Sequence, residues 1–185
     1  MIRNPQGALF WWRGLRPDYD RANPADRVGD RAALARLRRC DSVATAMQEL
    51  ATIALFRQCQ ADDARDLPGI ALAAAVLAHV RQEAPGRVAR QIGPESPDRP
   101  ETALLKPLRF RRLLEATDPE DCLLGFRRLV ALADDKANVS DLARALFDWP
   151  VPHRAERTKR DWIFIYWNAD PLRPAGAAPA KEPVA

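Results

Sequence analysis

The chain has 185 residues, 47% hydrophobic and 29% charged, with a formal net charge of +4, and this balance excludes a wholly disordered protein. Its apolar stretch at residues 70–80 is much shorter than the about 20 residues that cross a bilayer, and the N-terminus lacks an apolar signal segment, so we expect a cytoplasmic protein without a membrane partner. Three distant cysteines, Cys40, Cys59 and Cys122, argue against a disulfide framework or a zinc site.

The chain begins with two predicted helices. A short apolar segment at residues 8–15 is ended by Pro17. A second helix is expected at residues 26–40, where Leu34 and Leu37 fall on one side and arginines on the other. The polar side of this second helix therefore carries concentrated positive charge.

Two further helices complete the N-terminal half. Ser42 is a favourable N-cap for a third helix that runs to about residue 60. The apolar stripe expected on it consists of Met47, Leu50, Ile53, Ala54 and Phe56. Pro68 suits the first turn of a fourth helix, which extends to about residue 83 and is apolar nearly all round. We place this fourth helix at the centre of a bundle.

A Pro-rich segment at residues 85–100 separates the two halves of the chain. No helix is expected to persist through it, because proline and glycine interrupt helices. The second half resumes with a helix at residues 104–116, in which Phe110, Leu113 and Leu114 share one side. Its arginines lie on the opposite side.

Three more helices are expected before residue 168. Asp118 is a strong N-cap for the first of them, because a proline and two acids follow it. In this helix Arg127 and Arg128 are expected to point away from the buried face. A short helix is expected at residues 140–149 and a last one at 153–168.

Aromatic side chains cluster near both ends of this helical part. Trp162 and Tyr166 are four residues apart, which predicts a shared buried face. The adjacent Trp11 and Trp12 point to two sides of a helix, so one of them is expected to be partly exposed and available to a partner protein.

These patterns predict an all-α fold of about eight helices in two small helical bundles. No alternating apolar pattern predicts a β-strand. The expected division is an N-terminal bundle at residues 1–84, a Pro-rich linker at 85–101, a C-terminal bundle at 102–170 and a disordered tail at 171–185.

The sequence shows no motif for catalysis or for a bound cofactor. Only His79 and His153 are present, and neither has a carboxylate at the spacing of metal ligands. Glycine-rich phosphate loops and the common nucleophile motifs are absent. We therefore expect a protein that is not an enzyme and has no cofactor, no metal and no small-molecule substrate.

Positive charge is concentrated in four short islands at residues 31–39, 106–112, 127–128 and 154–160, so that the rest of the chain is net acidic. Like charges at helical spacing repel each other, and their accumulation favours an anionic partner. We expect contact with the phosphate backbone of nucleic acid rather than base stacking. The candidate nucleic-acid-binding residues are Arg31, Arg38, Arg39, Lys106, Arg109, Arg111, Arg112, Arg127 and Arg128. The alternative interpretation is a solvated helix surface in an arginine-rich protein.

Five sequence blocks occur in an order and spacing that span most of residues 8–168. They are LFWWRGLRP, DRAALARLRRC, LRFRRLLEATDPEDCLLGFRRLVAL, DLARALFDW and RDWIFIYW. In this combination they resemble the CasB family, the small subunit of the type I-E CRISPR surveillance complex Cascade.

The resemblance implies a non-catalytic protein made of two helical bundles. Two copies would pack head-to-tail within the complex, beside the backbone and large subunits, with guide RNA and target DNA as further partners. Their basic surfaces would stabilise the R-loop and the displaced strand. The positions that match are Arg38 and Arg39 in LARLRR, Arg109, Arg111 and Arg112 in RFRR, and Arg127 and Arg128 in FRRL.

Two other functions fit parts of the sequence. One is an α-helical adaptor whose arginine-rich faces bind acidic partner proteins. The other is a helix-turn-helix regulator that uses residues 104–132. The second is disfavoured, because no short glycine-containing turn joins two helices of suitable length and the arginines are not grouped at one helix N-terminus.

Overall fold

The computed structural model describes residues 2–16 and 29–169. Within them the chain forms ten α-helices and one pair of two-residue strands, which confirms the expected all-α class. The start of the predicted second helix, residues 26–28, and the predicted tail at 171–185 lie outside the described residues.

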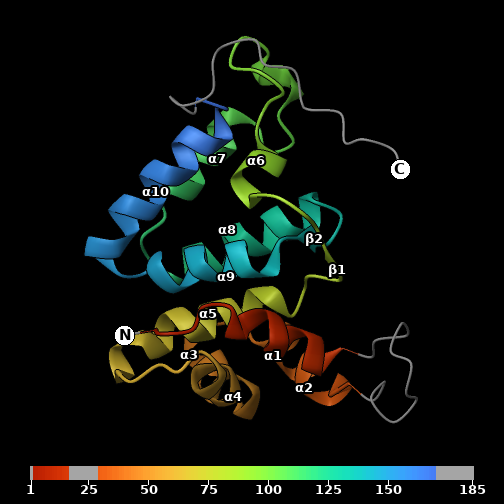
Figure 1. Cartoon of the computed structure of the whole chain (residues 1–185), viewed down its shortest axis with the longest axis vertical. Coiled ribbons are helices and arrows are strands. Elements are labelled where there is room, and N and C mark those ends of the chain that lie inside the picture. Colours follow the sequence, from red (N-terminus) through yellow and green to blue (C-terminus); the bar gives the residue numbers. More distant parts are fainter. Residues whose placement is uncertain (1, 17–28, 170–185) are drawn as a thin grey trace, which may run out of the picture.

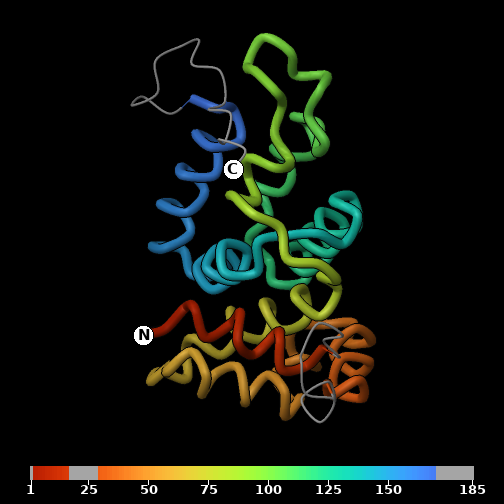
Figure 2. Tube along the Cα trace, turned by 45° about the vertical axis from the view of Figure 1, so that its right-hand side comes forward, coloured from red at the N-terminus to blue at the C-terminus, as the bar shows by residue number. Residues whose placement is uncertain are grey.

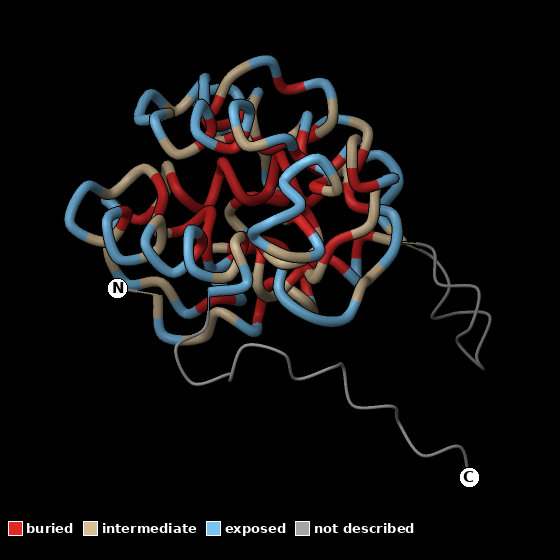
Figure 3. The backbone as a smooth tube through the Cα atoms, turned by 90° about the horizontal axis from the view of Figure 1, so that it is seen from above, coloured by how far each residue is buried: buried red, intermediate tan, exposed pale blue. Residues whose placement is uncertain are grey.

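The helices form two tiers (Figures 1 and 2). The lower tier in Figure 1 contains α1 (Gly7–Leu15), α2 (Arg31–Arg39), α3 (Val43–Met47), α4 (Leu50–Gln58), the 3-10 turn η2 (Ala64–Asp66) and α5 (Leu67–Leu77). The upper tier contains α6 (Val88–Ile92), the 3-10 turn η3 (Pro100–Thr102), α7 (Pro107–Glu115), α8 (Pro119–Leu132), α9 (Val139–Asp148) and α10 (Pro152–Tyr166). Both tiers contribute to one hydrophobic cluster, and buried segments run through the middle of the molecule (Figure 3).

Helix α5 lies at the centre of this cluster, as predicted. Its side chains from Ile70 to Leu77 have no exposed surface, and each large aliphatic one contributes about 1.5–3 kcal/mol by burial. It packs against α3 and α4 below and against α8 and α9 above. At Gly69 a Cβ atom would lie 2.7 Å from the carbonyl oxygen of Phe147 in α9, so the two helices approach closely only because this residue is glycine. The tiers are therefore joined through α5.

The predicted third helix is divided into α3 and α4. Ser42 caps α3 as expected, since its hydroxyl accepts the backbone N–H of Thr45 at 3.0 Å. The chain then breaks after α3, and this shifts the buried side of α4 away from the predicted stripe. Leu50 is 79% exposed, whereas Thr52 is buried and donates its hydroxyl to the carbonyl oxygen of Ala46 at 2.6 Å. The apolar pattern alone predicts one continuous helix and does not indicate this break.

The Pro-rich segment contains a helix of its own. As predicted, no helix runs through residues 85–100, but the sequence does not predict the short helix α6, which fits between the first two prolines of the segment. Just after α6, a Cβ atom at Gly93 would collide with the carbonyl oxygen of Tyr166 in α10. The hydroxyl of Tyr166 donates to the carbonyl oxygen of Leu105 at 2.7 Å, which anchors the chain just after the segment. The division of the chain at 85–101 stays a prediction.

Two short strands pair in parallel, β1 (Gln82–Glu83) and β2 (Lys136–Ala137), and the sequence does not predict them. Their pairing links the segment that follows α5 to the segment that follows α8. The backbone N–H of Arg81 extends the pairing by donating to the carbonyl oxygen of Asp135 at 2.7 Å. Asp134 and Asp135 have positive φ angles of 58° and 57°, a left-handed turn that aspartate adopts more readily than most residues.

The aromatic side chains belong mainly to the core. Trp162 and Tyr166 share a buried face of α10, which confirms that prediction. Trp149 meets Trp162 edge-on, with 5.2 Å between ring centroids. The expectation that Trp11 or Trp12 is partly exposed is wrong, because both are only 7% exposed and both indole N–H groups donate to backbone carbonyl oxygens. Helix α1 packs between α4 and α9, which leaves neither ring on the surface.

Candidate nucleic-acid interface

The most exposed basic island lies on α7. Pro107 occupies the first helical position, where its missing N–H would have no partner in any case. Phe110 and Leu113 are buried, and the ring of Phe110 stacks on Tyr166 with 3.9 Å between centroids. This packing fixes the rotation of the helix about its axis. It places three guanidinium groups on the exposed side, those of Arg109, Arg111 and Arg112.

The three α7 arginines have no partner in the part of the chain that the structure describes. Across residues 2–16 and 29–169, none of their side chains forms a hydrogen bond or an ion pair. Arg109 and Arg112 are three residues apart, a spacing at which like charges repel by a few tenths of a kcal/mol. Lys106, at the N-terminal end of the island, is exposed and donates to the carbonyl oxygen of Glu101 at 2.5 Å. The island therefore presents guanidinium donors that suit an external anion.

The two adjacent arginines of α8 lie in different environments. Asp118 caps the helix as predicted, with its carboxylate accepting backbone N–H groups of the first turn. Arg128 is exposed and has no partner among the described residues. Arg127 is half-buried and donates to the carbonyl oxygens of Leu37 at 3.2 Å and Ala75 at 3.5 Å. The prediction that Arg127 points away from the core is therefore wrong.

The same face of α8 also caps the start of α3. Glu120, seven residues before Arg127, accepts the backbone N–H of Val43 with both carboxylate oxygens at 3.1 Å. One face of α8 thus satisfies backbone donors at the start of α3 and backbone acceptors in α2 and α5.

The start of α2 is set by Asp30. Its carboxylate accepts the backbone N–H of Ala33 at 2.8 Å, so the helix begins at Arg31 rather than at the predicted residue 26. The side chain of Arg31 is exposed.

The other α2 arginines have three different environments. Arg39 is exposed and has no partner among the described residues. Arg38 is half-buried, and its Nε donates to the carbonyl oxygen of Ala78 at 2.7 Å. Arg36 forms an ion pair with Glu49 at 3.0 Å. The positive charge of this island is therefore only partly available to another molecule.

Two further arginines, Arg16 and Arg81, lie at the segment that follows α5. Arg16 donates to the carbonyl oxygen of Val80 and lies over the ring of Trp12, 4.9 Å from its centroid. Arg81 pairs through Nε with a carboxylate oxygen of Asp135 at 3.0 Å. Neither Arg16 nor Arg81 is among the predicted site residues. No local signal marks them, since their partners Val80 and Asp135 are distant in the sequence.

Burial suppresses the reactivity of the titratable groups near the core. The pKa of His79 is lowered to about 4, chiefly because burial disfavours its charged form and then because Arg127 and Arg38 lie nearby. Burial also raises the pKa of Cys59 to about 12 and that of Cys122 to about 11. These thiols are therefore not activated as nucleophiles. In the described part of the chain, no group of three or more His, Cys, Asp or Glu could hold a metal ion.

The last basic stretch, on α10, is also divided between internal and exposed groups. Arg154 forms ion pairs with Asp66 at 2.8 Å and with Asp148 at 3.4 Å. Arg157 and Arg160 are exposed and have no partner among the described residues. These two have the same i, i+3 spacing as the pair on α7.

Residues 33–167 match the family described as CRISPR-associated protein Cse2. The chain belongs to the Cse2 family. This confirms the resemblance to CasB, another name for this family of the type I-E Cascade complex. Family membership implies that the chain is a Cascade subunit. No curated protein and no solved structure gave a significant match.

The match to Cse2 covers every predicted site residue except Arg31, which lies two positions before it. The arginines of α7 and α8 are well inside the matched range. Of the described helices, none is both long and apolar enough to cross a membrane.

Proposed function

We propose that this chain is a non-catalytic Cascade subunit that binds nucleic acid without sequence preference and stabilises the R-loop and the displaced DNA strand. The observation that carries the proposal is the α7 island. Arg109, Arg111 and Arg112 are exposed and have no partner within residues 2–16 and 29–169, while the opposite side of the helix is held in the core. Lys106 at the N-terminal end of α7, Arg128 on α8 and Arg39 on α2 add exposed positive charge.

Backbone contacts of this kind suit R-loop formation. Exchange of a DNA duplex for an RNA–DNA hybrid is nearly balanced in free energy, so a few contacts to phosphates can decide its direction. Guanidinium groups bind phosphate oxygens in pairs, and such contacts carry no base sequence. With about 5 phosphate contacts to a single strand, the logarithm of affinity would fall with the logarithm of salt at a slope of about −3.5.

The partners in this proposal are those of a subunit inside a ribonucleoprotein. They are the backbone and large subunits of Cascade, a second copy of this chain, the guide RNA and the target DNA, all in the cytoplasm. The chain would supply positive charge and shape, and base pairing with the guide would supply the sequence specificity.

The adaptor function remains the second candidate because apolar side chains accompany the exposed arginines. Leu108, next to Arg109, is 60% exposed, and Leu124, one turn before Arg128, is 48% exposed. A leucine beside an arginine is typical of a protein contact more than of a phosphate contact. Under this alternative the arginines would pair with carboxylates of a partner protein.

Charge reversal on α7 separates the two candidates. The purified chain is titrated with a non-specific single strand and with duplex DNA at about 50 to 300 mM salt, the range in which counterion release changes affinity most. Arg109→Glu with Arg112→Glu is expected to weaken binding about tenfold or more and to reduce R-loop formation by the reconstituted complex. Arg157→Glu with Arg160→Glu is the matched control, with equal charge change and equal spacing on α10.

A double variant on α7 that forms wild-type R-loops would contradict the proposal. The adaptor function would be favoured if that variant failed to assemble into the complex and the isolated wild-type chain bound no DNA at low salt.

A further inference from the structure

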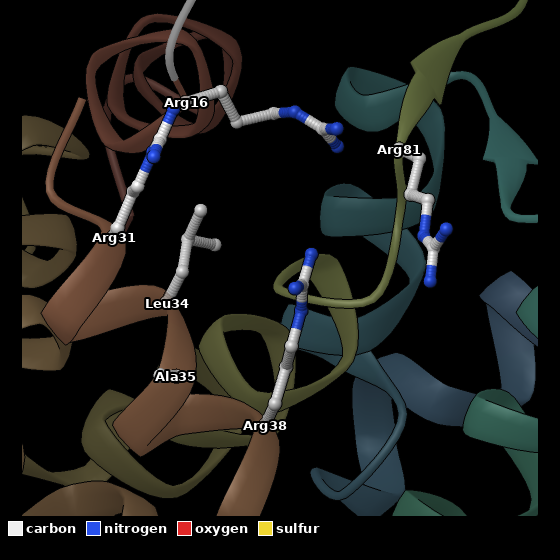
Figure 4. Close-up of a pocket in the computed structure, with 6 residues that line it drawn as sticks. All are labelled: Arg16, Arg31, Leu34, Ala35, Arg38 and Arg81. Carbon is white, nitrogen blue, oxygen red and sulfur yellow. The ribbon is translucent and has the colours of Figure 1, made fainter. Parts of the chain in front are cut away.

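A hollow of about 450 Å³ lies where the end of α1, the side of α2 and the segment after α5 meet (Figure 4). Four arginines surround it, and two apolar residues also line it. The lining consists of Arg16, Arg31, Leu34, Ala35, Arg38 and Arg81. The side chains of Arg16 and Arg38 extend into the same space from two elements, with Arg81 on the far side. The hollow therefore gathers charges from parts of the chain that are distant in sequence.

The fold holds three of these guanidinium groups in place through one nitrogen each. Arg16 donates one Nη–H to the carbonyl oxygen of Val80, and Arg38 donates its Nε–H to that of Ala78 at 2.7 Å. Arg81 uses its Nε in the ion pair with Asp135. A guanidinium carries five N–H donors, so each group keeps several of them for a ligand. This is preorganisation, because the side chains are positioned before any ligand arrives.

Within the described residues, the charges of Arg16, Arg38 and Arg81 are only partly balanced by carboxylates. Asp135 forms an ion pair with Arg81, whereas Arg16 and Arg38 donate to carbonyl oxygens. The pKa of Arg16 is lowered, first by burial and then by the nearby charges of Arg38 and Arg81. The cations therefore repel one another across a partly desolvated space, and an anion placed between them would relieve the repulsion.

We propose that this hollow binds a phosphate group, carried by the backbone of a nucleic acid. The inference rests on the proposed function and adds to it a site with two residues, Arg16 and Arg81, that are not among the predicted candidates. Bidentate guanidinium donors match phosphate oxygens, and the apolar surface of Leu34 and Ala35 suits the neighbouring sugar. A free phosphorylated molecule offers the same chemistry, and the experiment distinguishes the two sources.

The test uses the two most exposed arginines of the hollow, so that the anchoring bonds of Arg16 and Arg38 stay intact. Arg31→Gln with Arg81→Gln removes both charges, and Arg31→Lys with Arg81→Lys keeps them. Melting of each variant without ligand verifies the fold. The probes are pyrophosphate, followed by its effect on the melting temperature, and a non-specific single-stranded oligonucleotide, followed by anisotropy at several salt concentrations.

In the wild type, pyrophosphate is expected to raise the melting temperature by a few degrees, and the glutamine variant is expected to lose this shift. Oligonucleotide binding by that variant is expected to weaken about three- to tenfold, with the salt slope reduced by about 1 to 2. The lysine variant is expected to retain most of the pyrophosphate-induced shift and most of the affinity for the oligonucleotide. Loss of both signals assigns the hollow to nucleic-acid backbone, and loss of the pyrophosphate signal alone assigns it to a free phosphorylated molecule.

The inference is overturned if the glutamine variant binds pyrophosphate and oligonucleotide like the wild type. Should α7 charge reversal abolish DNA binding in that case, the proposed function would stand without this site. Conversely, a chain that binds pyrophosphate in the hollow but no nucleic acid, alone or in Cascade, would retain the site and lose the proposed function.

Discussion

The basic islands of α2 and α7 are alike in sequence but different in the structure. On α7 all three arginines are exposed and have no partner among the described residues. On α2 one arginine is bonded to a carbonyl group after α5 and another is paired with a glutamate. Adjacent positions on α8 repeat this contrast, since Arg127 is internal and Arg128 is exposed. The number of charges in an island therefore overestimates the guanidinium donors that remain for a ligand.

The difference depends on what lies next to each helix. The last carbonyl groups of a helix have no partner within it, and they carry partial negative charge. Helices α2 and α8 both run beside the end of α5, where such carbonyl groups accept from Arg38 and Arg127. Helix α7 rests on α10 and α8 through Phe110 and Leu113, away from that helix end.

The largest expected effect is on stability, from Arg127→Ala. The substitution leaves the carbonyl groups of Leu37 and Ala75 without the donor that now reaches both. We expect a loss of about 2–3 kcal/mol in the free energy of unfolding, and a melting temperature lower by about 5–10 °C. Urea and thermal denaturation followed by circular dichroism would measure both. Arg128→Ala is the matched control and should change stability by less than about 0.5 kcal/mol. Equal losses in the two variants would contradict the contrast between internal and exposed arginines.

A smaller effect is expected when pH is lowered, because of His79. Its pKa in the folded chain is about 4, below the value of about 6.5 expected for an unfolded one, so the unfolded chain takes up the proton first. The stabilisation is present above pH about 6.5 and is lost as pH falls towards 4. Because the side chain is only half-buried, we expect a loss of about 1–2 kcal/mol across that range.

Comparison of two histidine variants isolates this contribution. His79→Gln should flatten the dependence of the unfolding free energy on pH between about 6.5 and 4, and His153→Gln, at an exposed position, is the control for loss of a histidine. If His79→Gln followed the wild-type curve, burial and the nearby charges of Arg127 and Arg38 would not lower the pKa of His79 as the structure indicates.

The smallest effect is expected on α7. Arg109→Gln with Arg112→Gln removes a repulsive i, i+3 pair and breaks no hydrogen bond among the described residues, so stability should stay constant or rise by about 0.2–0.5 kcal/mol. Chemical denaturation at low salt would detect this change, and added salt should diminish it. A clear loss of stability would mean that the α7 arginines support the fold, which would remove the basis for placing the interface there.

Local signals in the sequence predict much of the fold. Caps such as Ser42 and Asp118, and the apolar sides of α5, α7 and α10, follow from residue type and helical period. Such patterns depend on neighbours within one or two turns, and they place most helices within a few residues of their observed bounds.

Contacts between distant residues explain what the sequence does not predict. The break between α3 and α4 is stabilised by the hydroxyl of Thr52, and α6 is held by its contact with α10. The different environments of Arg127 and Arg128 depend on where α2 and α5 end, far away in the sequence. For the candidate site, helical period predicts the exposed α7 arginines, but it cannot show that Arg16 and Arg81 join Arg38 around one hollow.

The face of α8 that carries Glu120 and Arg127 has a consequence for synthesis on the ribosome. The first five helices leave the ribosome before α8, while the backbone groups at Val43, Leu37 and Ala75 still lack the partners that α8 supplies. The packing of the N-terminal helices therefore depends on hydrogen bonds from residues that are synthesised later. The core is complete only after α8 has been added. A released chain truncated before residue 120 should accordingly be more open to proteolysis than a released chain that includes α8 through residue 132.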